Sequence, residues 1–422
     1  MSNAFSKEER VAFEDLLEAF DDMLVLSRNV SKYRVGDTEM ERAGDVIWRP
    51  QPYIAQSFDG MDQTANFTDK TQLSVPATLG YSKSSPWIMD AKELRDALQE
   101  NRLGMAAKQK LASDINVAIM NVAAAQGTLV VPVATAATGF GDVALVEAIM
   151  NEQGVPGYDR YLALSTRDYN GLARDLANRQ TLTGKPLKAY EQAYVGLIAS
   201  FETYKMDYAN RIAAAGGGGG ITMSTLVGAA NYYVPKATST AVTGEKSNVD
   251  NRFQTITVST TVGVAAGDAF TVADLDAVHH ITKGDTGQLK TFRVISVDSG
   301  TTMTISPPMI TGQGGSDAEL QYQNCTLLTP AANSALVFLN IAATSINPFW
   351  QMDALEILPG HYAVPSDAGT NVMRGTTDQG IELVMQKWYD IKTMKTLYRC
   401  DTLFGVVNKQ PEMSGILIFN QT

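Results

Sequence analysis

The sequence predicts an α+β protein with an inserted all-β module, and three observations support that class. Apolar residues recur at helical spacing from 91 to 126, and this segment contains no proline. A run of five glycines, 216–220, precedes a stretch rich in Thr, Val, Gly and Ser that ends near Ser334. Such a stretch is typical of short strands joined by turns. The chain closes with three long strand-like segments, 381–391, 396–407 and 415–419.

Composition limits the class of protein further. The 422 residues are 45% apolar and 19% charged, and 34 basic against 45 acidic side chains give a net charge of −11. This length predicts two or three domains, and the apolar fraction excludes a disordered chain. No apolar run reaches the roughly 18 residues of a membrane span, and we expect no signal peptide. A pI near 4.9 argues against nucleic-acid binding through a basic surface.

The N-terminal segment predicts a short amphipathic helix. Apolar residues recur at helical spacing, and acidic residues stand between them. The apolar set is Phe13, Leu16, Leu17, Phe20, Met23 and Leu24. Three of the acids, Glu14, Asp15 and Glu18, form a compact negative group, whose first and last members share one helix face. This group is either a solvated face that keeps the protein soluble or a salt-sensitive docking site for a basic partner segment.

Three further parts precede the glycine run. Residues 44–85 are polar, rich in turn residues and too long for an ordinary loop, so we expect a projecting β-hairpin. Asp90 with Glu93 opens a second helix with a capping signature, and a continuous helix to residue 126 would be roughly 50 Å long. Helical and strand-like pieces then alternate from 128 to 215. These pieces are 142–150, 161–164 and 167–178.

The stretch after the glycine run predicts a small β module with its own core. Its strand candidates are 254–259, 269–272, 291–297 and 302–306, with a tight turn at 298–300. We expect Phe292 and Val294 in the core of this module, and we expect the segment 335–341 that follows to be helical. The flexible entry and the separate strand set predict a module that folds alone.

The sequence shows none of the common active-site motifs. The glycine run lacks the Lys-Ser/Thr pair of a phosphate loop, and no serine-hydrolase, zinc-protease or kinase signature occurs. His279 and His280 are adjacent and His361 stands alone, so all three are expected to be loop or surface residues. Cys325 and Cys400 lie in no metal-binding spacing, and we expect Cys400 to be buried in its apolar strand. We therefore predict no catalytic residue, no cofactor and no metal.

Several short strings resemble the major capsid (coat) proteins of short-tailed, lambda-like phages of the P-twenty-two type. The strings are Glu14-Asp15-Leu16-Leu17-Glu18, Ile47-Trp48 with Pro50, Leu94-Arg95-Asp96, Val249-Asp250-Asn251-Arg252-Phe253 with Thr255, Asn347 with Phe349-Trp350, and Gly405-Val406 with Asn408 and Pro411-Glu412. They occur in the family's order over nearly the whole chain. Their shared order and the similar chain length carry the resemblance.

The resemblance implies the Hong Kong 97-type capsid fold, an α+β architecture that here carries an inserted all-β, barrel-like domain. The expected parts are an N-terminal arm at 1–43, an extended β-hairpin loop at 44–88, the long spine helix of a peripheral domain at 89–128, an axial domain at 129–218, the inserted domain at 219–336, the second part of the axial domain with a hinge at 337–375, and the C-terminal strands of the peripheral domain at 376–422.

The same resemblance implies a structural protein without enzymatic activity. It implies self-assembly into pentamers and hexamers of an icosahedral shell, first as a scaffold-containing procapsid and then as the mature head around double-stranded DNA. The implied partners are other copies of the chain, an internal scaffolding protein and a portal protein at one vertex. No membrane and no sequence-specific DNA contact are expected. The implied location is the virion, after assembly in the host cytoplasm.

The resemblance also assigns two sets of site residues. Scaffold binding is assigned to Glu14, Asp15 and Glu18, because the scaffolding protein of the resembling family docks near the N-terminal arm. Contacts between capsomers are expected around Glu245, Lys246 and Asp250, although the loop at 238–247 carries fewer acids than the family's loop.

Two other classes remain open. A phage adhesin or receptor-binding protein would explain the Thr/Gly-rich β module, but the long helix and the absence of repeats disfavour it. A hydrolase with an unrecognised site is disfavoured by the missing motifs.

Overall fold

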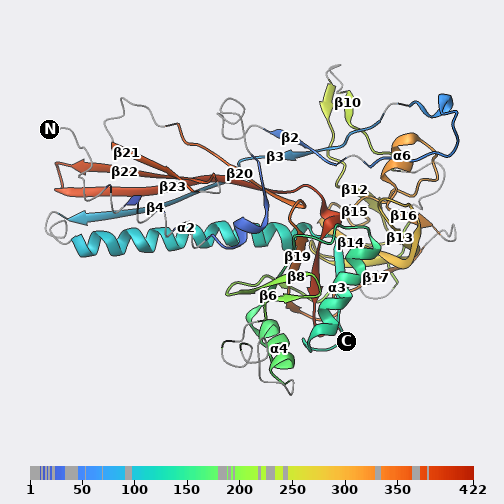
Figure 1. The fold of residues 1–422 in the computed structure, drawn as a ribbon, viewed down its shortest axis with the longest axis horizontal. Coiled ribbons are helices and arrows are strands. Elements are labelled where there is room, and N and C mark those ends of the chain that lie inside the picture. Colours follow the sequence, from blue (N-terminus) through green and yellow to red (C-terminus); the bar gives the residue numbers. More distant parts are fainter. Residues whose placement is uncertain are drawn as a thin grey trace. The chain divides into compact units, whose positions relative to one another are not determined.

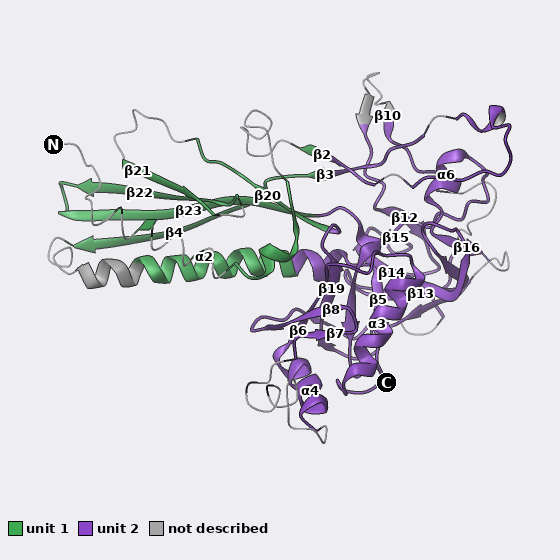
Figure 2. Ribbon diagram, viewed as in Figure 1, with its two compact units in different colours: residues 1–47, 77–120, 355–407 green, residues 48–76, 121–354, 408–422 purple. Residues whose placement is uncertain are grey.

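The structure, a computed structural model, divides the chain into two compact units (Figure 2). The first unit comprises residues 1–47, 77–120 and 355–407, and the second comprises 48–76, 121–354 and 408–422. The described residues are 10, 13, 14, 17, 20, 24–33, 46–52, 54–68, 70–90, 97–178, 188, 192, 195–216, 220–224, 233–240, 246–327, 334–363, 371–377 and 380–422. Each unit is thus assembled from segments that lie far apart in the sequence.

The first unit is built on a six-stranded sheet (Figure 1). Its strand order is β1-β20-β23-β22-β21, and β4 also pairs with β23. The bounds are β1 Ser31–Lys32, β4 Tyr81–Asp90, β20 Leu355–Pro359, β21 Asn371–Thr376, β22 Glu382–Asp390 and β23 Lys395–Asn408. Side chains of β4 alternate between more and less exposed along most of the strand, as in a sheet with one packed face. Strands predicted at 381–391 and 396–407 are confirmed.

The long helix and the described part of the arm also belong largely to the first unit. Helix α2, Ala97–Gln126, has 30 residues and is about 45 Å long, which confirms the predicted spine helix, while residues 91–96 lie outside the described part. Its buried side chains include Leu111, Ile115 and Ile119, at helical spacing. In the arm, Phe13 and Phe20 are buried whereas Glu14 is exposed. The described arm residues therefore show the predicted amphipathic pattern.

The second unit contains a sheet with the order β5-β24-β19-β6-β8-β7. The bounds are β5 Leu129–Pro132, β6 Arg160–Ser165, β7 Leu197–Ile198, β8 Phe201–Met206, β19 Asn347–Gln351 and β24 Ser414–Ile418. Helices α3, Phe140–Glu152, and α4, Thr166–Ala177, share one core with these strands. Val146 and Leu172 are helix residues of that core, and Leu162, Phe201 and Phe349 are strand residues.

One glycine is required for close strand packing in this sheet. A Cβ at Gly415 would lie 2.2 Å from the Leu129 carbonyl oxygen and 2.5 Å from the Phe349 ring. No side chain fits there, so the parallel pairing of β24 with β5 depends on Gly415.

A second six-stranded sheet of the same unit has the order β12-β15-β14-β13-β16, with β17 pairing β13. The bounds are β12 Gln254–Thr257, β13 Ala269–Val278, β14 Asp285–Val297, β15 Thr302–Ser306, β16 Cys325–Leu327 and β17 Leu336–Phe338, and helix α6 spans Asp317–Tyr322. All four predicted strands are present. Phe292 and Val294 are buried in the core of this sheet, as predicted. Every residue of that core lies between Ile221 and Leu336.

The prediction of a helix at 335–341 is wrong, because Leu336–Phe338 form strand β17. Leu336 pairs with Val272 and is buried, whereas Val337 is exposed. This alternation has the period of a strand, and pairing with β13 outweighs the weak helical pattern of so short a segment.

Short two-stranded sheets complete the described secondary structure. β2, Ile47–Pro50, pairs with β3, Ser74–Ala77, within the stretch 44–85 for which a hairpin is predicted. β9, Arg211–Ile212, pairs with β18, Thr344–Ser345. Residues 81–88, which fall in the range expected for the extended loop, belong to strand β4, which pairs with β23. The division of the chain into the named capsid domains stays a prediction.

Candidate functional site: assembly surfaces

The arm lies against the edge strand of the first unit. Gly375 of β21 is in contact with it, since a Cβ there would lie 2.7 Å from a Leu17 methyl carbon and 3.1 Å from the Phe13 ring. An open groove of about 430 Å³ follows this contact. Its lining residues are Arg10, Phe13, Glu14, Leu17 and 371–375. The arm helix thus places Phe13 inward and leaves the Glu14 carboxylate exposed.

The structure locates only one of the three acids assigned to scaffold binding. Glu14 is exposed, and Asp15 and Glu18 lie outside the described residues. The assignment of the acidic group to a scaffolding protein stays a prediction.

The second set of site residues lies on and beside a small hairpin of the second unit. β10, Thr238–Thr240, pairs with β11, Lys246–Asn248, and Thr240 stands opposite Lys246. Glu245 lies outside the described residues. The polar loop expected at 238–247 is therefore a two-stranded hairpin that presents the Lys246 position at its outer end.

Asp250 follows the hairpin and binds within its own chain. Its carboxylate accepts hydrogen bonds from Arg252 Nε at 3.0 Å and Nη2 at 2.8 Å. The Arg252 guanidinium also donates to the Asn408 carbonyl oxygen at 2.9 Å. Asn251 donates to the Lys236 carbonyl oxygen at 2.6 Å and accepts from the Lys236 amide at 3.0 Å. These bonds fix the base of the hairpin, and the Asp250 side chain keeps 22% of its surface exposed.

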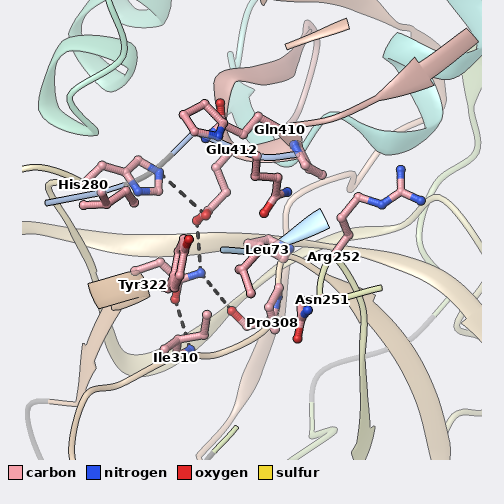
Figure 3. A pocket seen from close by; sticks show the side chains of 15 residues that line it. Leu73, Asn251, Arg252, His280, Pro308, Ile310, Tyr322, Gln410 and Glu412 are labelled. Atoms are coloured by element: carbon pink, nitrogen blue, oxygen red, sulfur yellow. Dashed lines mark hydrogen bonds and ion pairs between the residues drawn. The ribbon is translucent and has the colours of Figure 1, made fainter. Parts of the chain in front are cut away.

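A small pocket of about 50 Å³ lies next to this base (Figure 3). Arg252 and Asn251 line one part, and Glu412 and His280 line another. The Glu412 carboxylate binds Lys290 Nζ at 2.5 Å and Asn324 Nδ2 at 3.1 Å, and it lies 3.7 Å from His280 Nε2. Lys290 is 1% exposed and also donates to Gln153 Oε1 at 3.1 Å. The pocket wall is therefore a buried ionic cluster.

Burial and the neighbouring charges together set the protonation states in this cluster. Burial lowers the pKa of His280 to about 4. Glu412 acts in the opposite direction and raises this pKa, whereas Lys290, Lys283 and His279 lower it further. Burial, partly offset by Glu412, lowers the pKa of Lys283 to about 8. Burial opposes ionisation of Glu412, but Lys290, His280 and Lys283 outweigh it and lower the pKa of that carboxyl. At neutral pH Glu412 is therefore a carboxylate, Lys283 is largely protonated and His280 is a neutral imidazole.

Residues missed by the sequence analysis join the second sheet to neighbouring elements of its unit. Lys290 of β14 reaches Glu412, which precedes β24. Arg293, also of β14 and 1% exposed, donates to the carbonyl oxygens of Gly267 at 3.0 Å and of Gly127 at 3.3 Å. Gly127 directly follows α2, so the guanidinium binds the first carbonyl oxygen beyond that helix end. His280, predicted to lie in a loop or on the surface, follows β13 in a turn but is only 17% exposed.

The described residues contain no group of three or more metal-ligating side chains. Cys325 and Cys400 are both buried, as predicted for Cys400, and burial raises the pKa of each thiol to about 12. Within the described part, none of the helices combines the length and apolar character that a membrane crossing requires.

Comparisons with known proteins give a consistent result. A family model described as P22 coat protein, gene protein 5, matches residues 1–420. The chain is similar to a structure from Mycobacterium phage Che8, at 8% identity over 93% of this chain and 90% of that chain, with a TM-score of 0.45. It is also similar to the capsid of the cyanophage P-SCSP1u, at 10% identity over 93% and 87%, with a TM-score of 0.43. The CUS-3 coat protein I-domain matches at 38% identity over 28% of this chain and 95% of that chain, with a TM-score of 0.22.

The family match spans nearly the whole chain, so it does not depend on any single string of residues. It decides against the adhesin and the hydrolase alternatives. The helices and strands of the structure confirm the expected α+β class, in which a long helix accompanies several sheets. The chain belongs to the P22 coat protein family and is a major capsid (coat) protein, a structural subunit that forms a phage shell with other copies of itself.

Proposed function

We propose that this capsid protein assembles into pentamers and hexamers of an icosahedral shell, first as a procapsid around an internal scaffolding protein and then as a mature head. The match of the coat-protein family over residues 1–420 carries the proposal. In this scheme a portal protein occupies one vertex, and assembly takes place in the host cytoplasm before the shell encloses double-stranded DNA.

The charge balance supports a shell that does not bind DNA tightly. The net charge of −11 opposes association with the phosphate backbone, whose binding depends on basic side chains. DNA can then be packed into the shell without being held by its inner wall.

The acidic residues of the arm support the proposal of a scaffolding protein that binds and later dissociates. The exposed Glu14 carboxylate on the outer side of the arm helix, with Asp15 and Glu18 next to it in sequence, suits a basic scaffold segment. Single exposed ion pairs contribute only about 0.2–1 kcal/mol, so such docking is reversible and salt-sensitive.

Co-expression with the scaffolding protein tests the proposal. We expect particles of megadalton mass in gel filtration and closed shells in negative-stain micrographs. Recovery of only monomers or dimers from the same preparation contradicts it.

A further inference from the structure

One face of the sheet in the first unit carries a row of partly exposed apolar side chains. Leu397 of β23 stands opposite Ile88 of β4 on one side and opposite Trp388 of β22 on the other. The exposed fractions are 54% for Ile88, 38% for Leu397 and 45% for Trp388. Directly opposite side chains on neighbouring strands point to the same face, so these three residues form a continuous strip across three strands. We call this strip the apolar row.

The rows on either side of the apolar row are polar and charged. Toward the β22–β23 turn lie Asp90, Lys395 and Asp390, which stand opposite one another, and Lys395 Nζ lies 3.7 Å from the Asp90 carboxylate. On the other side Arg399 stands between Pro86 and Gln386. The apolar row is thus flanked on two sides by rows whose charged residues have both signs, and we call these two rows the rim.

The opposite face of the same strands is packed within the unit. Met89, Thr396 and Tyr398 are buried, and Trp87 stacks on Tyr398 at 5.5 Å between ring centroids. The sheet therefore already has one packed face, and the apolar row lies on the other. Ile391 and Met394, in the turn between β22 and β23, are exposed as well and enlarge the apolar surface near the row.

This arrangement is that of a protein–protein contact. Interfaces place apolar and aromatic residues at the centre and polar residues at the rim, and Trp and Arg are enriched among the residues that dominate binding. A cluster of exposed large apolar side chains on one face marks an interaction site more often than it marks ordinary surface.

We propose that the apolar row is a contact surface for a second copy of this chain in the assembled shell. Shell formation with other copies brings such a copy to every subunit. The mixed charges of the rim favour a partner surface of mixed charge. A nucleic acid or a strongly basic scaffold segment would instead select a rim of one sign. The proposal rests on shell assembly, but on no particular role of the scaffold.

Glutamate substitution tests the contribution of the row to assembly. Trp388→Glu places a carboxylate in the proposed contact, where burial without a partner is costly. We expect this variant to fold like the wild type, because the position is half exposed, and to yield at least tenfold fewer shells in sedimentation and micrographs. Val262→Glu is the matched control, since Val262 is 78% exposed in the second unit. Normal shell yield with Trp388→Glu, or an equal loss with both variants, overturns the proposal.

Thiol labelling tests whether a neighbouring copy covers the row. The two natural cysteines are buried, so Leu397→Cys supplies a single accessible thiol. We expect maleimide to label free subunits of this variant at least tenfold faster than shells from which scaffold has been removed. Equal labelling of subunits and shells overturns the proposal, and so does protection that requires bound scaffold. Failure of the wild type to form shells in the same preparation would instead contradict the proposed function.

Discussion

At the scale of single residues, the most consequential feature is the Glu412 carboxylate, which is bound by a buried lysine. Glu412 binds Lys290 directly, and Lys290 is almost completely buried. Such a pair contributes little net stability compared with an apolar pair of the same size, but removing one partner leaves an uncompensated charge. The pair therefore acts as a constraint that fixes β14 against the segment before β24.

Removal of the ammonium group tests this constraint. We expect Lys290→Met to lower the free energy of unfolding by about 3 kcal/mol, because Glu412 is left without its closest cation. The double variant Lys290→Met with Glu412→Gln should recover much of the loss, as measured by urea denaturation of the full chain. Lys110→Met is the control, because Lys110 is exposed and its pair with Asp114 is a surface pair. A single variant as stable as the wild type contradicts the role of the pair.

His280 makes the stability of the fold depend on pH. Its folded pKa of about 4 lies below the ordinary histidine pKa of 6.5, so between these values the unfolded chain binds a proton that the folded chain does not. The contribution of His280 is therefore complete above pH 6.5 and is lost as the pH falls toward 4, by up to roughly 3 kcal/mol. Denaturant titrations across this range should show a flatter pH dependence for His280→Asn than for the wild type. The exposed His361 provides the control, and an unchanged slope in His280→Asn contradicts the assignment.

The alternation of side chains along β14 shows which buried residues could be predicted from the sequence. Phe292 and Val294 were expected in the core and are buried, and Lys290 shares their alternation, so its burial was open to prediction from the same pattern. Arg293 has the opposite parity and is buried too, because β14 is covered on both faces at that point. The partner Glu412 is 122 residues away, and no local pattern connects them.

At the scale of elements, the period of the sequence predicted most helices and strands. The spine helix, the four strands of the β module and the closing strands follow from alternation or helical spacing. Among the segments that the structure describes, the short one around Leu336 was assigned the wrong type. The third closing strand, β24, pairs with β5 and β19 in the second unit, whereas β22 and β23 belong to the first. Pairing partners depend on packing between distant segments, which a local period does not encode.

The three acids of the arm should matter for scaffold binding and not for folding. We expect the triple variant Glu14→Gln, Asp15→Asn, Glu18→Gln to remain folded and to bind scaffolding protein at least tenfold more weakly at low salt, because three weak ion pairs are lost together. Binding is measured by surface plasmon resonance at two salt concentrations. Glu147→Gln with Glu152→Gln removes acids from α3 as a matched control. Unchanged, salt-independent affinity of the triple variant returns these acids to the role of a solvated face.

At the scale of the whole molecule, function depends on contacts that exist only between copies. The family assignment was accessible from sequence because its strings are spread along the entire chain. The apolar row was not, since Ile88 and Leu397 become neighbours through a strand register that joins positions about three hundred residues apart. A shift of that register by one residue would turn one of them to the opposite face.

A change in the β10–β11 hairpin should affect the assembled shell and not the isolated subunit. A two-stranded hairpin contributes little to the stability of a domain, so a change at its outer end should leave the subunit folded. Loss of one exposed ion pair costs only about 0.2–1 kcal/mol. If the hairpin forms such a pair between capsomers, this cost recurs at every contact of that kind in the shell. We therefore expect Lys246→Glu to lower the urea concentration at which shells dissociate while the thermal unfolding temperature of the subunit stays unchanged. Lys188→Glu, at another exposed position, controls for the change of net charge. A subunit that unfolds earlier to the same degree as its shells dissociate would make the hairpin a structural element rather than a contact between capsomers.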